Sequence, residues 1–226
     1  MRFQDAARDA RAVVYAGIQA DPQVSRAAAL LADASTEQRL LARAVMNGET
    51  VDADGWRTMF PTLFGPSVPA DADALARSEA ILDVALGVAD RGEQVRSQVR
   101  GAIVEELTAQ LLARRAPRGT VHRERRILFD GVRAEIHPYD VTVELDGAAE
   151  AYDCKWGARG INADVLHQLD DARTNAAEED ERLAVALVIF DARRSCDVRL
   201  ERQTAPHAAT EVVALETLDS LAGRMA

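Results

Sequence analysis

The chain has 226 residues, enough for one large domain or for a core domain with a smaller second one. Hydrophobic residues make up 48% of the sequence, an ordinary share for a protein with a packed core. The net charge of −10 excludes a molecule that attracts nucleic acid over its whole surface, so any polyanion has to be met by a local basic patch.

The sequence carries no sign of export or of membrane insertion. The first residues, MRFQDAARDARAVV, are charged where a secretory signal would be apolar. The longest apolar run, AVALVIF at 184–190, is too short to span a bilayer. The two cysteines, Cys154 and Cys196, give no disulfide framework and no metal-type spacing. We therefore expect a cytoplasmic protein with no membrane partner.

The first third of the chain has helical periodicity. Apolar residues recur at a spacing of three to four, with breaks at Asp21-Pro22 and Asn47-Gly48, over residues 5–19, 25–34 and 36–46. Three prolines and a glycine predict a loop over 61–69, and the helical pattern resumes over 71–92. We expect an all-α N-terminal region over residues 1–92, suited to forming a homodimer, to positioning substrate or to contacting a protein partner.

From residue 93 the pattern predicts a second, α/β domain that continues to residue 226. A helix from 93 to about 115 precedes a series of strands, which are predicted at 120–131, 136–147 and 149–156. A helix at 162–180, a buried strand at 182–191 and a closing strand and helix at 211–225 follow. Three meandering strands followed by a crossover helix predict a mixed sheet flanked by helices.

The turn between the second and third of these strands fixes a specific pairing. Asp146-Gly147 is a two-residue hairpin signal because both central positions need a positive φ. If this turn forms, Leu145 pairs with Ala148, and Asp140 then faces Asp153 across the two strands. Lys155 lies on the same face. A four-residue loop would keep the three groups on one face, whereas a three-residue loop would separate them.

Lys155 is the only lysine in the sequence, since every other basic side chain that is not histidine is arginine. Two carboxylates directly opposed on neighbouring strands repel each other unless a cation lies between them. A divalent metal ion is one such cation, because hard cations take carboxylate oxygens. The alternative is an ordinary ion pair between Asp153 and Lys155 on the polar face of a surface hairpin, which stabilises a protein very little.

These residues resemble the PD-(D/E)xK nuclease superfamily. Pro138-Tyr139-Asp140 followed by Asp153-Cys154-Lys155 is similar to the motif of that family, with one residue between the proline and the aspartate. The order of elements from 93 to 216 is similar too. The resemblance implies a restriction-endonuclease-like fold and phosphodiester hydrolysis that depends on Mg²⁺ or Mn²⁺.

The resemblance also implies roles for individual residues. Asp140 and Asp153 would bind the metal together with the backbone carbonyl of Cys154, and Lys155 would be catalytic. Glu105, on the helix before the strands, matches the glutamate that assists in the family and would be a further metal ligand and catalytic residue, with Glu106 as the competing choice. Gln168 matches a glutamine that some branches carry on the crossover helix, which makes it a candidate for substrate binding.

Arginines provide the local positive charge that a polyanion needs. Residues 113–126 hold six arginines and one glutamate, and the family site would lie nearby. Arg123, Arg125 and Arg126 are therefore candidates for contact with phosphates, and so is Arg159 beside two glycines. The alternative is that these arginines are solvated or lie at the negative end of a helix dipole.

Three functions fit these observations. The first is a Mg²⁺-dependent nuclease. We expect its substrate to be DNA rather than RNA, because DNA is the commoner substrate in the family that the sequence resembles. The second is a catalytically inactive module on the same fold that serves binding or assembly. The third is a helical interaction protein in which the α/β part is only a scaffold.

Overall fold

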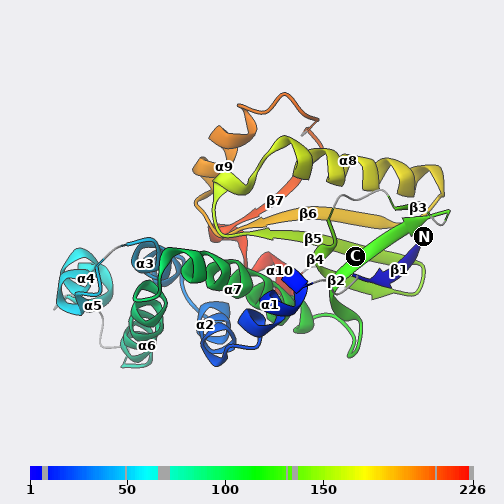
Figure 1. Ribbon diagram of the computed structural model, residues 1–226. Helices are drawn as coiled ribbons and strands as arrows, with labels where there is room; N and C mark the ends of the chain where they lie inside the picture. Colours follow the sequence, from blue (N-terminus) through cyan, green and yellow to red (C-terminus); the bar gives the residue numbers. More distant parts are fainter. Residues whose placement is uncertain are drawn as a thin grey trace. The chain divides into compact units, whose positions relative to one another are not determined.

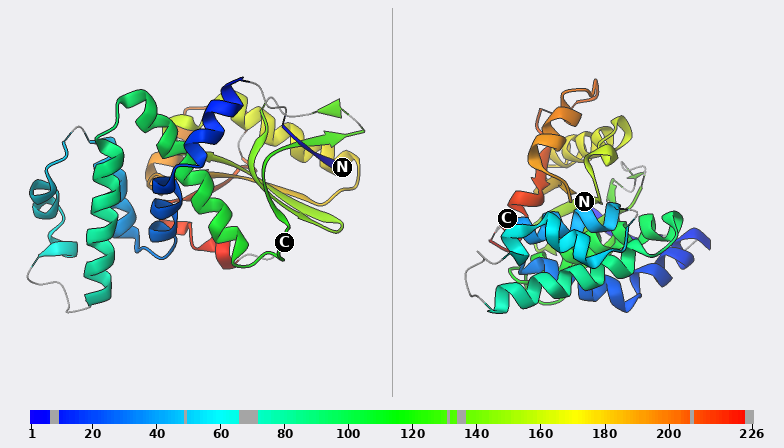
Figure 2. Two further views of the ribbon diagram at one scale, coloured as in Figure 1. Left: turned by 60° about the horizontal axis from the view of Figure 1, so that its bottom comes forward. Right: turned by 90° about the vertical axis from the view of Figure 1, so that its left-hand side faces the viewer.

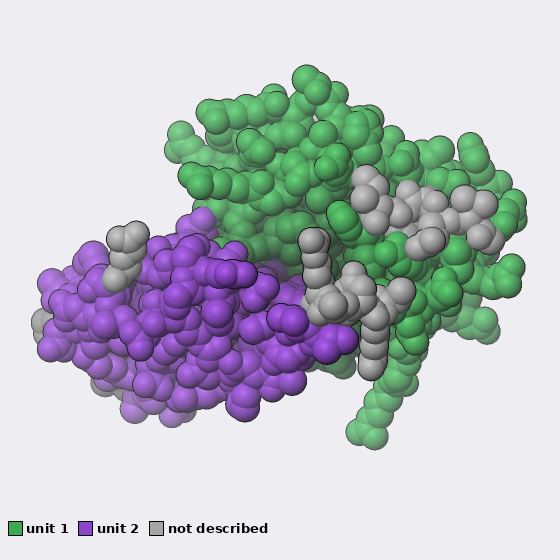
Figure 3. Space-filling view, viewed as in Figure 1, with its two compact units in different colours: residues 1–12, 108–226 green, residues 13–107 purple. Residues whose placement is uncertain are grey.

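The computed structural model describes residues 1–6, 10–48, 50–65, 72–130, 132–133, 137–206 and 208–223. The chain forms two compact units (Figure 3): residues 13–107, here called the helical unit, and residues 1–12 with 108–226, here called the sheet unit. This division differs from the boundary expected at residue 92. The first residues belong with the sheet, and the helix that starts at Glu93 contributes to both units.

The helical unit is built from amphipathic helices with defined starts. Asp21 caps α2 by accepting a hydrogen bond from Gln23 N, and Ser35 forms a capping box with Gln38 at the start of α3. α6 packs against α2 and α3 (Figure 1). The helices with residues in this unit are α1 (Ala10–Gln19), α2 (Pro22–Ala32), α3 (Thr36–Asn47), α4 (Ala53–Met59), α5 (Pro61–Phe64), α6 (Ala72–Ala89) and the first part of α7 (Glu93–Ala113).

Two expectations for the first third of the chain were wrong. The region is not all helical, because Arg2–Asp5 form strand β1, which pairs antiparallel with β2. The predicted loop over 61–69 begins with the short helix α5, since proline suits the first turn of a helix. The rest of that loop, from residue 66, lies outside the described residues.

The sheet unit contains a mixed sheet in the order β1-β2-β4-β5-β6-β7, with the short β3 paired to β2. Pairing is antiparallel from β1 to β5 and parallel from β5 to β7, so the predicted meander and crossover are confirmed. The strands are β2 (Val121–Phe129), β3 (Val132–Arg133), β4 (Tyr139–Leu145), β5 (Ala148–Lys155), β6 (Leu183–Ile189) and β7 (Glu211–Ala214).

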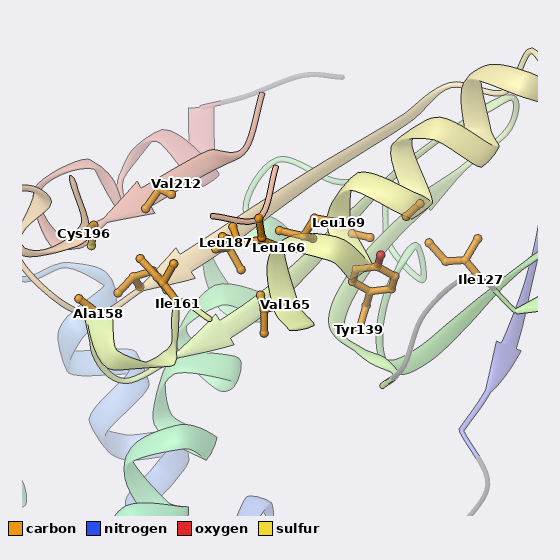
Figure 4. Packing of buried hydrophobic residues seen from close by; sticks show 14 of the residues in the cluster. Ile127, Tyr139, Ala158, Ile161, Val165, Leu166, Leu169, Leu187, Cys196 and Val212 are labelled. Atoms are coloured by element: carbon orange, nitrogen blue, oxygen red, sulfur yellow. The ribbon is translucent and has the colours of Figure 1, made fainter. Parts of the chain in front are cut away.

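Helix α8 (Ala163–Glu178) connects β5 to β6 and lies alongside the sheet in each view (Figures 1 and 2). Its apolar side chains pack on the sheet, with Leu166 and Leu169 beside Leu187 and Tyr139 (Figure 4). A further helix, α9 (Arg193–Leu200), was not predicted. The short η1 (Ala158–Gly160), η2 (Leu215–Thr217) and α10 (Ser220–Gly223) complete the unit. The chain is therefore a mixed α/β protein whose sheet is flanked by helices.

The β4–β5 hairpin has the predicted register. Leu145 pairs with Ala148, and the ladder continues to Val141 opposite Tyr152. Gly147 has a φ of 76°, a conformation that glycine adopts without steric cost. The two-residue turn therefore forms with the predicted pairing, but the positive φ predicted for both central positions occurs only at Gly147 and not at Asp146.

Within the part of the chain that the structure describes, every helix is too short or too polar to cross a bilayer.

Candidate active site

Asp140, Asp153 and Lys155 meet at the end of the β4–β5 hairpin, just beyond the last pair of the ladder. Lys155 Nζ contacts Asp153 Oδ1 and lies 3.9 Å from Asp140 Oδ2. The predicted proximity of the three side chains is thus confirmed, while their chemical roles stay predictions. We call Asp140 and Asp153 the acidic pair.

Asp140 is held where the two strands of the hairpin stop pairing. The backbone N–H of Cys154 donates to Asp140 Oδ2 at 2.6 Å, so a side-chain carboxylate takes the place that a strand carbonyl would occupy. A backbone N–H in a partly buried strand needs such a partner. This contact fixes one oxygen of Asp140 beside β5.

The same strand geometry directs the carbonyl of Cys154. In a β-strand the N–H and C=O of one residue project to the same side, and successive residues alternate. Lys155 O accepts from Phe190 N at 2.9 Å on the β6 side, and Cys154 N points to Asp140 on the β4 side. The Cys154 carbonyl therefore faces the side of the acidic pair. Its thiol points elsewhere and donates weakly to Thr108 Oγ1 at 3.5 Å.

The three charged side chains differ in how far solvent reaches them. The exposed fraction is 8% for the Asp153 side chain, 17% for Asp140 and 30% for Lys155. Burial alone would lower the pKa of Lys155. The charges of Asp140 and Asp153 outweigh that effect and hold its pKa above the usual value for lysine. The ammonium is therefore charged at neutral pH and neutralises one of the two carboxylates.

Two carboxylates and one backbone carbonyl are oxygen ligands of the kind that Mg²⁺ and Mn²⁺ prefer, so the residues present fit such an ion. Among the described residues, no group of three or more His, Cys, Asp or Glu side chains is arranged to hold a metal. A cation bound by the acidic pair would therefore complete its shell with the Cys154 carbonyl and water.

Glu105 lies on the part of α7 that belongs to the helical unit. It is buried, and its carboxylate accepts hydrogen bonds from Tyr15 OH and, at 2.8 Å, from Gln19 Nε2. Both donors come from α1, one turn apart. Glu106 is partly exposed. Glu105 therefore stays a predicted member of the site, and α1 is the element that orients it.

Part of the expected basic patch is engaged within the protein. Arg125 forms ion pairs with Glu144, at 2.7 Å, and with Asp5. The hydrogen bonds to these carboxylates raise its pKa further. Arg123 and Arg126 lie on the same strand and are partly buried, whereas Arg159 is exposed in η1. Of the four candidates for phosphate contact, Arg159 is the most accessible.

Gln168 is only 3% exposed, and its amide is used at both ends. Its Oε1 accepts from His137 N and its Nε2 donates to His137 O, each at 3.1 Å. An amide engaged in this way holds the chain three residues before Asp140. This contact favours a structural role for Gln168 over the predicted contact with substrate.

Two further residues that sequence reasoning did not select shape the turn that follows Lys155. Gly160 packs against the side chain of Lys155, and Asp191 accepts a hydrogen bond from Ala158 N at 3.1 Å in the same turn. The two glycines at 157 and 160 were the available signal, because glycine close to a strand end often marks a close approach. Nothing local distinguishes Asp191 from other aspartates.

Comparisons with models of protein families, with curated proteins and with solved structures gave no match.

Proposed function

We propose that the chain is a nuclease of restriction-endonuclease-like fold that hydrolyses phosphodiester bonds, preferentially of DNA, and depends on Mg²⁺ or Mn²⁺. One observation carries this proposal: the β4–β5 hairpin brings Asp140, Asp153 and Lys155 together, with the ammonium within reach of both carboxylates. The motif and the order of strands and helices around it support the same fold.

Each residue of the site then has a task. Asp140, Asp153 and the carbonyl of Cys154 would hold the ion. A bound Mg²⁺ or Mn²⁺ polarises a phosphate and lowers the pKa of a coordinated water. Lys155 is protonated in this arrangement, so it would donate a hydrogen bond to the attacking water or to a phosphate oxygen rather than accept a proton. Its charge would stabilise the negative charge that builds up on phosphorus oxygens.

The test is cleavage of supercoiled plasmid, linear and single-stranded DNA, and of RNA, with Mg²⁺ or Mn²⁺ and with EDTA. We expect cleavage of DNA that EDTA abolishes. Asp140→Asn and Lys155→Met should each lower the rate by about 10²- to 10⁴-fold, the range for losing a group that acts in the transition state. The exposed Asp171→Asn is the matched control and should cut like the wild type. Cleavage by Asp140→Asn and Lys155→Met at the wild-type rate would refute the site.

A catalytically inactive binding or assembly module on the same fold is the second candidate. It is favoured by the ion pairs of Arg125, which reduce the charge available to phosphates. Melting with Mn²⁺ separates the two functions. A working acidic pair should raise the melting temperature as Mn²⁺ is added, because an ion that binds only the folded state stabilises it. A chain that cuts no nucleic acid and shows no response to Mn²⁺ is the binding module.

A further inference from the structure

The side chain of Lys155 is held along its whole length. A Cβ placed on Gly160 would lie 2.7 Å from both Cβ and Cγ of Lys155 and 3.0 Å from its Cδ. Contacts this short do not occur between real carbon atoms, so no side chain fits at position 160 unless Lys155 moves. The φ of Gly160 is not in the left-handed region, so space and not backbone conformation requires the glycine.

The turn that carries Gly160 is itself anchored to the sheet. Ala158 N donates to Asp191 Oδ2 at 3.1 Å, and Ala192 N donates to the other oxygen of Asp191 at 2.8 Å. Asp191 lies two residues after the end of β6 and is 7% exposed. Because β5 and β6 are parallel neighbours, Asp191 and Lys155 stand at the same end of the sheet. A buried carboxylate with two backbone donors therefore fixes the turn against the end of β5.

At its other end the side chain is fixed by charge. Nζ contacts Asp153 and lies 3.9 Å from Asp140 Oδ2, as described above. Lysine has four rotatable bonds, and an exposed lysine samples many rotamers. Here the methylenes lie against Gly160 and the ammonium lies against the acidic pair. The side chain therefore loses its conformational entropy when the protein folds, and this entropy does not have to be lost again in each catalytic cycle.

We propose that Gly160, with Asp191 behind it, is a positioning residue for Lys155. The turn at 157–160 packs against the methylene groups of Lys155 and so keeps its ammonium beside the acidic pair. The catalytic consequence of this arrangement rests on the proposed function, whereas the arrangement itself is tested separately.

The first test observes Lys155 directly, since the only lysine gives a single spin system in protein labelled with ¹³C-lysine. In the wild type we expect two distinct shifts for the protons on Cε, because the side chain is held. In Gly160→Ala they should merge as the side chain becomes mobile. Gly92→Ala is the control, because a Cβ at Gly92 meets nothing within 4 Å. Identical lysine signals in Gly160→Ala and the wild type would overturn the proposal.

The second test uses DNA cleavage. Displacing a catalytic group by about 1 Å costs up to about 100-fold in rate, so Gly160→Ala should lower kcat by about 10- to 100-fold. KM should stay unchanged, because Gly160→Ala replaces none of the side chains that are candidates for contact with phosphates. A change in KM alone would contradict a positioning role. If the wild type cuts no nucleic acid, the proposed function fails and the lysine signals still decide the positioning proposal.

Asp191→Asn provides a second variant that leaves the space at Gly160 unaltered. An amide has one oxygen, so it keeps one of the two backbone hydrogen bonds and loses the other. We expect the same change in the lysine signals as in Gly160→Ala, but smaller. If Gly160→Ala does not fold, Asp191→Asn decides: lysine signals identical to the wild type would refute the proposal.

Discussion

Lys155 shows how one residue can serve stability and chemistry at once. Its ammonium neutralises part of the acidic pair, and those carboxylates in turn hold its pKa above the usual value. A basic group with a raised pKa contributes stability that is complete below its unfolded pKa and is lost as the pH rises through the folded one. The contribution of Lys155 is therefore present in full at neutral pH.

Lys155→Met should lower the free energy of unfolding at pH 7 by about 1–3 kcal/mol, because it leaves two carboxylates close together without a cation. Their mutual repulsion exists only while both carboxylates are ionised, so the deficit should be smaller at pH 4 than at pH 7. Urea denaturation at both pH values measures it.

Arg26→Met is the control for this comparison. Arg26 forms an ion pair with Asp83 in which both side chains are more than half exposed, at 55% and 69%. Such a pair is worth about 0–1 kcal/mol. A deficit of Lys155→Met that equals that of Arg26→Met at both pH values would show that the lysine does not neutralise the acidic pair.

At the scale of elements, a buried ion pair joins the turn after α7 to the sheet. Arg115 donates to Glu150 with both Nη atoms, and their side chains are 7% and 4% exposed. Tyr152 OH also donates to Glu150, at 2.6 Å, and Arg115 Nε donates to the carbonyl of Leu221 at 2.6 Å. The cluster therefore connects the turn after α7 with β5 and α10.

Glu150→Gln keeps the shape of the side chain and removes its charge. The buried guanidinium of Arg115 then lacks its counter-charge, and breaking such a pair costs about 3–5 kcal/mol. Urea denaturation at pH 7 should show this loss. Asp197→Asn, in the exposed pair with Arg193, should change stability by about 0.5 kcal/mol or less. If the free energy of unfolding falls by the same amount in both variants, the buried cluster does not stabilise the contact between these elements.

The elements that the sequence predicted are those with strong local signals. Asp146-Gly147 fixed the β4–β5 register, and an unbroken apolar run marked β6. β1 was missed because four residues have no measurable period and form a strand only by pairing with β2. α9 was missed because its sequence, RRSCDVRL, lacks an apolar stripe.

The candidate site divides in the same way. Asp140, Asp153 and Lys155 could be brought together from the hairpin alone, because their relation depends on one turn. The contacts of Gly160 with Lys155, of Asp191 with the turn and of Gln168 with His137 could not be predicted. The last two join residues about thirty positions apart in different elements, and only tertiary packing decides which side chains meet.

At the scale of the whole molecule, the reactivity of the two cysteine thiols measures whether the sheet unit is folded. Cys154 and Cys196 both belong to it and are buried. Burial, with the nearby charge of Asp191, raises the pKa of the Cys196 thiol to about 12. Only thiolates react with disulfide reagents at an appreciable rate. At pH 8 the native protein should therefore react slowly with such a reagent.

Titration with 5,5′-dithiobis(2-nitrobenzoate) tests this expectation. We expect little reaction in buffer and two thiols per chain in concentrated urea, with labelling that follows loss of the folded sheet unit. The absorbance of the released thiolate gives the count. Fast reaction of one thiol in buffer would contradict the burial of that cysteine.

The pairing of β1 also has a consequence for how the chain is made. Residues 2–5 leave the ribosome before their partners, residues 125–128, which are synthesised about 120 positions later. At the usual speed of translation the interval is roughly 6–24 s. All of residues 13–107 emerge during that interval and can fold before the sheet exists. The nascent chain thus carries an unpaired β-segment, which a ribosome-associated chaperone would be expected to shield until β2 appears.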